Sequence, residues 1–427
     1  MSSGNYDPHL HREVSNGLSN GVALVHILKG AIGTGILAMP DAFKNSGYIC
    51  GTLGTVLLAC LITNCTHSLM KSQYAICKKH HTPFMSYAES MKMALHMGPS
   101  CLSSCSNCSA HIVNWFLIIA QTGACCAYVT FVAENLRKVL QAHTDVNMDL
   151  RIYMIILIVP FILLNLVKNL KYLAPFSMLA DLLTLIGIIV VLYYLFKDGL
   201  SFDDRAAASS VSRWPLFLGT VLFSLQAIGV VLPVEYKMKK PKDFGGPSGI
   251  MNISMFIITV LYITVGFTGY IKYGENVLGS ITLNLPEKEF LANSITIFYI
   301  LAISVSHTLQ SYLPIQILLD DYIKKHLSEE FKNFEIVEYV THITYVLLTV
   351  LLAIAIPKLS FIISFFGAFC LSMLGITFPA IMEICIHYQD FDGRNYWNLI
   401  LNIFLIIFGI MGFIAGSYVA INDVLNG

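Results

Sequence analysis

Charged residues are scarce in this sequence. Only 12% of its 427 residues are Asp, Glu, Lys or Arg, whereas a soluble protein of this size carries about 25%. The basic and acidic residues also balance, at 26 of each, so the formal net charge is zero. The low charge argues against a soluble protein, and the balance gives no indication of a nucleic-acid partner.

Long polar stretches are missing as well. No segment between the apolar runs is long enough for a soluble domain. The first residues, which include Asp7, His9 and Arg12, lack the apolar core of a cleaved signal peptide. We therefore expect residues 1–20 to form a short cytoplasmic tail.

A disulfide framework is not indicated, although the chain has eleven cysteines. Most of them lie in or beside apolar runs, as Cys60, Cys125 and Cys370 do. The run "CLSSCSNC" (101–108) has a spacing that matches no standard zinc pattern with a fourth ligand. Free or lipidated thiols are favoured there over zinc, and we expect no metal site.

Apolar runs are abundant, since 56% of the residues are hydrophobic. A membrane-crossing helix needs about 20 apolar residues, and the sequence predicts eleven such spans in an all-α polytopic membrane protein. The predicted spans lie near 21–41, 48–75, 108–136, 151–168, 173–197, 214–235, 250–271, 291–319, 338–356, 359–386 and 396–420.

The loops between these spans differ in their content of Lys and Arg. If the N-terminus is cytoplasmic, more of the basic residues fall in cytoplasmic loops than in loops on the other side. Because cytoplasmic loops are generally enriched in Lys and Arg, the bias favours a cytoplasmic N-terminus.

Two spans carry matching helix-breaking sequences. The first reads "AIGTGIL" from Ala31, the sixth reads "AIGVVLP" from Ala227, and prolines follow at Pro40 and Pro233. Five spans separate the two starts, so the copies have opposite orientations in the membrane. Paired broken spans in two inverted halves indicate a secondary transporter that binds substrate at the breaks. The alternative is that both are plain kinks or close-packing faces.

Three longer motifs carry a family resemblance. "HILKGAIGTGILAMPDAFKNSG" (26–47), "AIGVVLPVEYKMKKPKDF" (227–244) and "YIKYGENVLGSITLNLP" (270–286) resemble the proton-coupled amino acid transporters of the amino acid/auxin permease group. The resemblance implies the LeuT-like fold of the APC superfamily, with two inverted five-helix repeats and one extra helix. It divides the chain into a first repeat at 21–197, an extracytoplasmic loop at 198–213, a second repeat at 214–386 and an eleventh helix at 396–420.

The resemblance also implies an activity and a binding site. The activity is symport of a proton with small neutral amino acids such as glycine, alanine and proline. His26 matches the essential histidine of the family, and backbone atoms at the two breaks would bind the substrate. The implied substrate-binding residues are Ile32, Gly33, Thr34 and Gly35 in the first span and Ile228, Gly229 and Val230 in the sixth.

This sequence departs from the family pattern in three places. Gln226 stands where many relatives have a glutamate, and His307 stands where a tyrosine is expected. Two lumenal cysteines that pair in many relatives are both absent. Gln226 and His307 are candidates for the lining of the substrate cavity.

Ionisable groups within spans are costly, so each one is a functional hypothesis. His26 titrates near neutral pH and is the candidate for the coupled proton; a structural histidine is the alternative. Asp181 is a weaker candidate for a proton or cation site, and an interhelical hydrogen bond is favoured for it. His307 is favoured as a packed, hydrogen-bonded histidine, and Lys29 as a side chain that reaches water.

Together these patterns predict a proton-coupled symporter of small neutral amino acids that works by alternating access. The alternatives are a sodium-coupled carrier of the same architecture and an amino-acid sensor with little flux. An enzyme is not expected, because no span carries paired acids or a His/Glu metal motif. The proton is the expected coupling ion, and no cofactor is expected. The sequence does not distinguish a location in the plasma membrane from one in the lysosomal or endosomal membrane.

Overall fold

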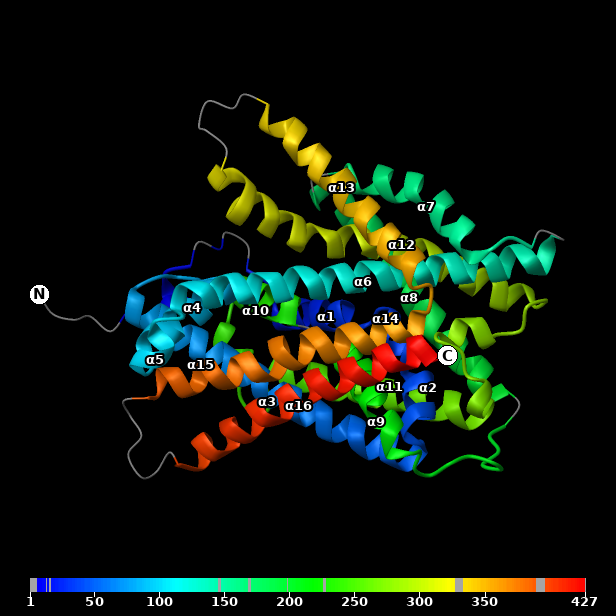
Figure 1. Cartoon of the computed structure of the whole chain (residues 1–427), viewed down its shortest axis with the longest axis horizontal. Coiled ribbons are helices and arrows are strands. Elements are labelled where there is room, and N and C mark those ends of the chain that lie inside the picture. The colour runs from blue at the N-terminus through cyan, green and yellow to red at the C-terminus, as the bar shows by residue number, and fades with distance from the viewer. Residues whose placement is uncertain are drawn as a thin grey trace, which may run out of the picture.

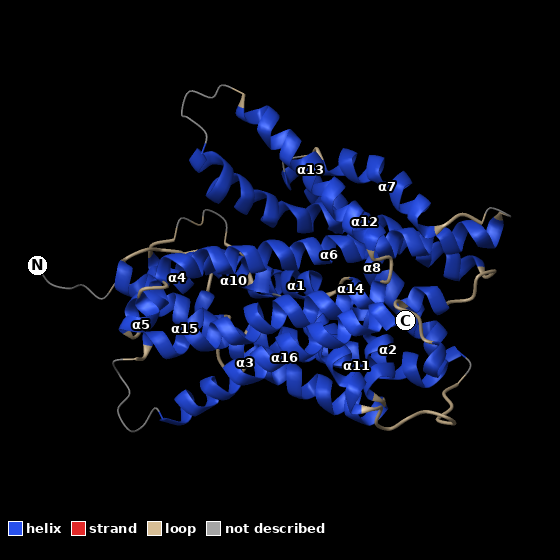
Figure 2. Cartoon of the chain, in the orientation of Figure 1, coloured by secondary structure: helices blue, strands red, loops and turns tan. Residues whose placement is uncertain are grey.

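The computed structural model describes residues 6–12, 14, 17–144, 147–167, 170–197, 199–225, 228–326, 333–388 and 396–426. Throughout these ranges the chain consists of helices joined by loops (Figure 2). Its β structure there is one isolated bridge between Leu18 and Met238.

The helices follow one another in the order of Figure 1. The first eight are α1 (Asn20–Ala31), α2 (Thr34–Ser46), α3 (Tyr48–His80), α4 (Tyr87–Met97), α5 (Ser100–Ser103), α6 (Ser106–His143), α7 (Leu150–Asn165) and α8 (Leu170–Lys197). The others are α9 (Trp214–Leu225), α10 (Ile228–Lys237), α11 (Ile250–Tyr273), α12 (Phe290–Ile317), α13 (Phe334–Ala355), α14 (Leu359–Phe366), α15 (Phe378–Ile386) and α16 (Tyr396–Asn426).

Most of the predicted spans are present as helices. Within the described ranges, nine helical stretches are long and apolar enough to cross a membrane, and the bent pair α1–α2 makes a tenth. The predicted count of eleven is not confirmed. The fourth predicted span corresponds to α7, which has only 16 residues, fewer than the roughly 20 that a crossing needs.

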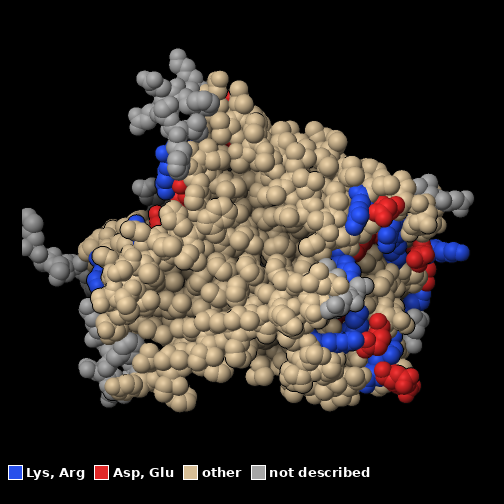
Figure 3. Space-filling model, viewed as in Figure 1, with Lys and Arg blue, Asp and Glu red and all other residues tan. Residues whose placement is uncertain are grey.

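The helices of the bundle run between two ends (Figure 1). We call the end where α1 begins the tail end and the end where α2 finishes the loop end. Most charged side chains in Figure 3 gather at these two ends and leave an uncharged belt between them. A belt of this kind is the surface that a lipid bilayer requires, so the chain is a multi-pass membrane protein.

The long span Leu359–Ile386 contains two π-helical segments, η8 (Gly367–Leu371) and η9 (Met373–Thr377). The segment η8 crosses α9 very closely. A Cβ atom added to Gly367 would lie only 1.9 Å from the Gly219 carbonyl oxygen. Helices in membranes associate through such small residues because lipid offers no hydrophobic drive. Gly367→Ala would therefore force these two helices apart.

The segment before α1 packs on the tail end of the bundle through Asp7 and Arg12. The Arg12 guanidinium donates to the carbonyl oxygens of Glu235 (3.1 Å) and Tyr236 (2.6 Å) at the end of α10. The Tyr74 hydroxyl of α3 donates to Asp7 at 3.2 Å. The segment before α1 is thus attached to α3 and α10.

Candidate functional site

The first span is broken where the sequence predicts it. Helix α1 ends at Ala31, α2 begins at Thr34, and the two helix axes differ by 54°. Ile32 has an extended backbone (φ −79°, ψ 93°), and Gly33 precedes the new helix. Glycine lowers helix stability by about 1 kcal/mol relative to alanine, which favours the break at this position.

The start of α2 leaves polar groups unpaired. The first N–H groups of a helix have no partner inside it, and Gly33 supplies no side-chain cap. The Thr34 hydroxyl oxygen is buried and has no hydrogen-bond partner in the described chain. The N-terminal end of a helix attracts negative charge, so this point suits a carboxylate.

Tyr262 of α11 connects the two halves of the site. Its side chain is fully buried. Its hydroxyl lies within hydrogen-bonding distance of the Ala31 carbonyl oxygen, where α1 ends, and of the Ser224 carbonyl oxygen in α9 (2.9 Å). A carbonyl left free by the end of a helix therefore finds a partner on a neighbouring span. The sequence interpretation did not identify Tyr262, because it lies in an otherwise ordinary apolar helix.

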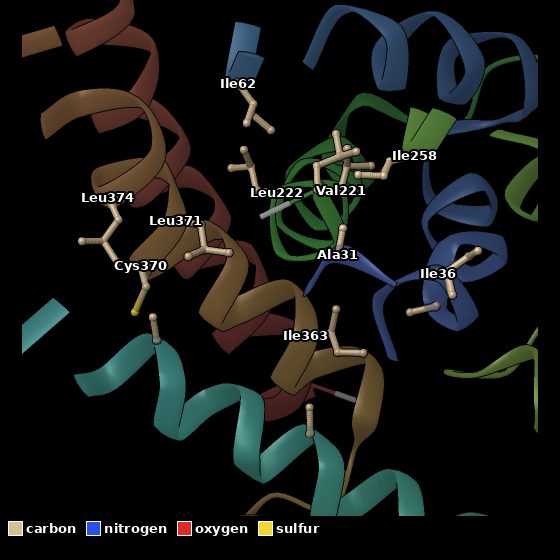
Figure 4. Packing of buried hydrophobic residues seen from close by; sticks show 14 of the residues in the cluster. Ala31, Ile36, Ile62, Val221, Leu222, Ile258, Ile363, Cys370, Leu371 and Leu374 are labelled. Atoms are coloured by element: carbon tan, nitrogen blue, oxygen red, sulfur yellow. The ribbon is translucent and has the colours of Figure 1, made fainter. Parts of the chain in front are cut away.

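Ser224 touches α2 directly. Its hydroxyl lies 3.0 Å from the Gly35 carbonyl oxygen and 2.7 Å from the Thr220 carbonyl oxygen. A Cβ atom on Gly35 would approach the Ser224 Cα atom to 2.7 Å, so only glycine fits between these helices. Figure 4 shows Ala31 and Ile36 on either side of the break.

The sixth span is described on both sides of its predicted break. Helix α9 ends at Leu225, and Ile228, Gly229 and Val230 form the first turn of α10. Gln226 lies outside the described residues, so a break at this point and a role for Gln226 stay predictions. A Cβ atom on Gly30 would lie 2.7 Å from Val230 Cγ2, which places the end of α1 against the start of α10.

His26 lies on α1, with its side chain exposed, one turn before Lys29. Lys29 forms an ion pair with Asp181 of α8 (Nζ–Oδ2, 2.5 Å) and donates to the Ser177 hydroxyl at 2.6 Å. Asp181 therefore holds α8 to α1. Residues three apart on a helix share a face, so His26 stands next to this ion pair.

His307 lies away from the break, in a buried polar cluster between α6, α7, α12 and α13. Its ring nitrogens lie 3.3 Å from Asn165 Nδ2 and 3.4 Å from Thr349 Oγ1. The Phe161 ring packs against it with centroids 4.4 Å apart. The structure thus pairs His307 with polar groups of neighbouring helices rather than with the break at Gly33.

A membrane bundle with a helix broken at mid-span is an arrangement found in secondary transporters. The chain belongs to the family described as "Transmembrane amino acid transporter protein", whose model matches residues 16–422. Amino acid transport is therefore the activity of its family.

Two relatives cover nearly the whole chain. The "Proton-coupled amino acid transporter-like protein pathetic" of Drosophila melanogaster is 32% identical over 426 residues, which cover 100% of this chain and 89% of the relative. The "Probable amino acid transporter skat-1" of Caenorhabditis elegans is 22% identical over 414 residues, which cover 95% and 90%.

Two solved structures share the fold. The inward-facing form of Mhp1 matches with a TM-score of 0.62 and 13% identity, covering 100% of this chain and 94% of that one. The closed form of Mhp1, a nucleobase–cation symporter with bromovinylhydantoin bound, matches with a TM-score of 0.54 and 11% identity, covering 98% and 93%. At these identities the likeness establishes the LeuT-like fold alone.

Proposed function

We propose that this protein is a symporter that moves a small neutral amino acid together with a proton. The observation that carries the proposal is the interruption at Ile32–Gly33. The free N–H groups and the buried Thr34 hydroxyl at the start of α2 offer donors to the substrate carboxylate. The last carbonyl groups of α1 have no partner inside that helix and are the proposed partners of the ammonium group. The first turn of α10, at Ile228, Gly229 and Val230, forms the opposite side of the proposed site.

His26 is the proposed carrier of the coupled proton, because its unperturbed pKa lies near physiological pH. The adjacent Lys29–Asp181 pair links it to α8. Protonation at His26 would therefore be felt where α1 and α8 meet, at the tail end. In this proposal the tail end faces the cytoplasm, as the loop charges predict, and the membrane is the plasma membrane or that of lysosomes and endosomes.

The decisive experiment is uptake of labelled alanine by proteoliposomes that hold the purified protein. An inward proton gradient should raise alanine inside above its outside concentration, and replacement of sodium by N-methylglucamine should leave the rate unchanged. A rate that depends on sodium and ignores the proton gradient would identify a sodium-coupled carrier. Saturable binding without uptake would identify a sensor.

His26→Ala should abolish the accumulation driven by the proton gradient, because the variant has no group to carry the proton. Exchange of alanine across the membrane should persist, since the break at Gly33 is untouched. His143→Ala is the matched control: among the residues that the structure describes, this exposed histidine bonds to the Val139 carbonyl oxygen of its own helix alone, at 3.0 Å. Normal accumulation by His26→Ala would refute the assignment.

A further inference from the structure

A cavity of about 480 Å³ lies at the loop end of the bundle. Its walls carry charges from several elements: Asp41 and Lys44 of α2, Glu134 of α6, Arg213 of η2 (Val211–Arg213), and Lys358 just before α14. Charged side chains are rare in this protein, so their concentration around one cavity suggests that the cavity binds a charged solute.

The cavity lies directly outside the break. Tyr128 of α6 faces the break, since its hydroxyl lies 3.5 Å from the position of a Cβ atom on Gly33. Glu134 comes six residues later on the same helix, about 9 Å towards the loop end. Asp41 comes seven residues after Thr34 on α2, about 10 Å in the same direction. The cavity therefore lies on the loop-end side of the break.

One carboxylate oxygen of Glu134 has no hydrogen-bond partner in the described part of the chain. This atom, Oε2, is buried. Burial of an unpaired carboxylate is costly. A ligand in the cavity that offers positive charge or hydrogen-bond donors would relieve this cost.

The other charges of the cavity are mostly matched. Lys44 contacts Asp41 (Nζ–Oδ1, 3.2 Å) and donates to the Val277 carbonyl oxygen at 2.8 Å. Arg213 contacts Glu275 at 3.6 Å. Lys358 is exposed, and within the described part of the chain no hydrogen bond or ion pair involves its side chain.

We propose that this cavity is an outer subsite for the backbone of an α-amino acid, in which Glu134 binds the ammonium group and Lys358 binds the carboxylate group. A zwitterion satisfies both unpaired charges at once, which a simple cation or anion does not. The inference rests on the proposed function, because it presupposes an amino acid as the solute. The subsite captures the substrate before it reaches the break.

The experiment measures initial rates of alanine uptake in proteoliposomes over a range of alanine concentrations. Glu134→Gln and Lys358→Gln should each raise KM about tenfold, the effect of losing one charge-assisted hydrogen bond. Vmax should stay within about twofold, because a saturating concentration bypasses the capture step. Glu134→Asp, which keeps the charge, should recover part of the lost affinity.

Glu287→Gln and Lys288→Gln are the matched controls, since both residues are exposed in a loop at the same end and line no part of the cavity. An unchanged KM in both cavity variants, or a fall in Vmax alone, would overturn the subsite while leaving transport itself established. Absence of uptake by the unaltered protein would instead contradict the proposed function. If Glu134→Gln does not fold, Lys358→Gln decides the question alone.

Discussion

The hydroxyl group of Tyr262 lies where two spans would otherwise leave carbonyl groups without partners. It reaches the Ala31 carbonyl oxygen at the end of α1 and the Ser224 carbonyl oxygen in α9. Inside a membrane bundle, water is not freely available to replace such a bond. One side chain thus stabilises the broken form of the first span.

Tyr262→Phe removes only this hydroxyl and should destabilise the broken form. The cost of leaving a buried acceptor unpaired is about 1–3 kcal/mol, so we expect a lower thermal midpoint in detergent and slower alanine uptake. Tyr299→Phe is the control, because the one hydrogen bond of that buried hydroxyl within the described part of the chain is long, 3.5 Å to the Thr184 carbonyl oxygen. An equal fall in thermal midpoint and uptake rate in both variants would contradict a specific role of the Tyr262 hydroxyl.

Sequence reasoning located some residues of the site and missed others for a physical reason. The break at Ile32–Gly33 was predictable because clustered glycines weaken a helix locally. Tyr262 was not, since its contact with Ala31 joins residues 231 positions apart, and no local pattern encodes it. Likewise, Lys29 and Asp181 were interpreted singly, and only the fold shows that they form an ion pair.

Among the elements, Lys138 of α6 joins this helix to the loop after α11. The Lys138 ammonium group donates to the carbonyl oxygens of Thr282 (2.8 Å), Leu283 (3.0 Å) and Leu285 (2.6 Å). These residues belong to the "ITLNLP" part of the third family motif. All eleven cysteines are free thiols, so hydrogen bonds and packing, rather than disulfides, order this loop.

Lys138→Met should loosen the loop, because three carbonyl groups, two of them buried, lose their donor at once. A hydrogen bond to a charged group contributes about 1.5–3 kcal/mol, so the thermal midpoint should fall clearly, and amide exchange should quicken around residues 282–285. Lys288→Met, at an exposed position in the same loop region, should change neither the thermal midpoint nor the amide exchange of residues 282–285. Unaltered exchange in the Lys138 variant would show that packing alone orders the loop.

The attachment of the N-terminal segment depends on pH through His9. Burial and the nearby Arg12 guanidinium hold the pKa of His9 below its ordinary value of 6.5, although Asp7 opposes them. A detached segment binds the proton more readily than an attached one. The attachment is therefore strongest above pH 6.5 and weakens as the pH falls from there through the lower pKa of the attached state.

Amide exchange of residues 8–11, corrected for intrinsic rates, should consequently be faster at pH 5.5 than at pH 7.5. His9→Gln should remove most of this difference. The ring of His9 also lies 3.6 Å from the Glu235 carboxylate, a contact that protonation would strengthen. Greater protection at pH 5.5 would mean that this contact dominates and would contradict the prediction.

At the scale of the whole molecule, the class of fold was predictable from hydropathy, while the exact course of the chain was not. The apolar runs predicted an all-helical membrane bundle, and the LeuT-like fold confirms it. The fourth predicted span, near 151–168, corresponds to α7, which ends at Asn165. An apolar run does not show where a helix stops. The side-chain amide of Asn165 donates to the Phe161 carbonyl oxygen and approaches His307.

The repeat boundaries at 21–197 and 214–386 stay predictions, as does the extra eleventh helix. Alternating access requires that one group of helices move against another around a fixed site. The Lys29–Asp181 pair joins α1 to α8, and Arg12 attaches the N-terminal segment to α10. Both lie at the tail end, whereas the charged cavity lies at the loop end.

The most direct test of substrate binding at the break is an electron cryomicroscopy map of the protein with alanine bound. We predict density for alanine at the start of α2, with its carboxylate about 3 Å from the N–H groups of Thr34 and Gly35 and next to the Thr34 hydroxyl. A map in which α1 and α2 form one continuous helix, or in which alanine occupies only a position remote from Ile32–Gly33, would contradict the proposal.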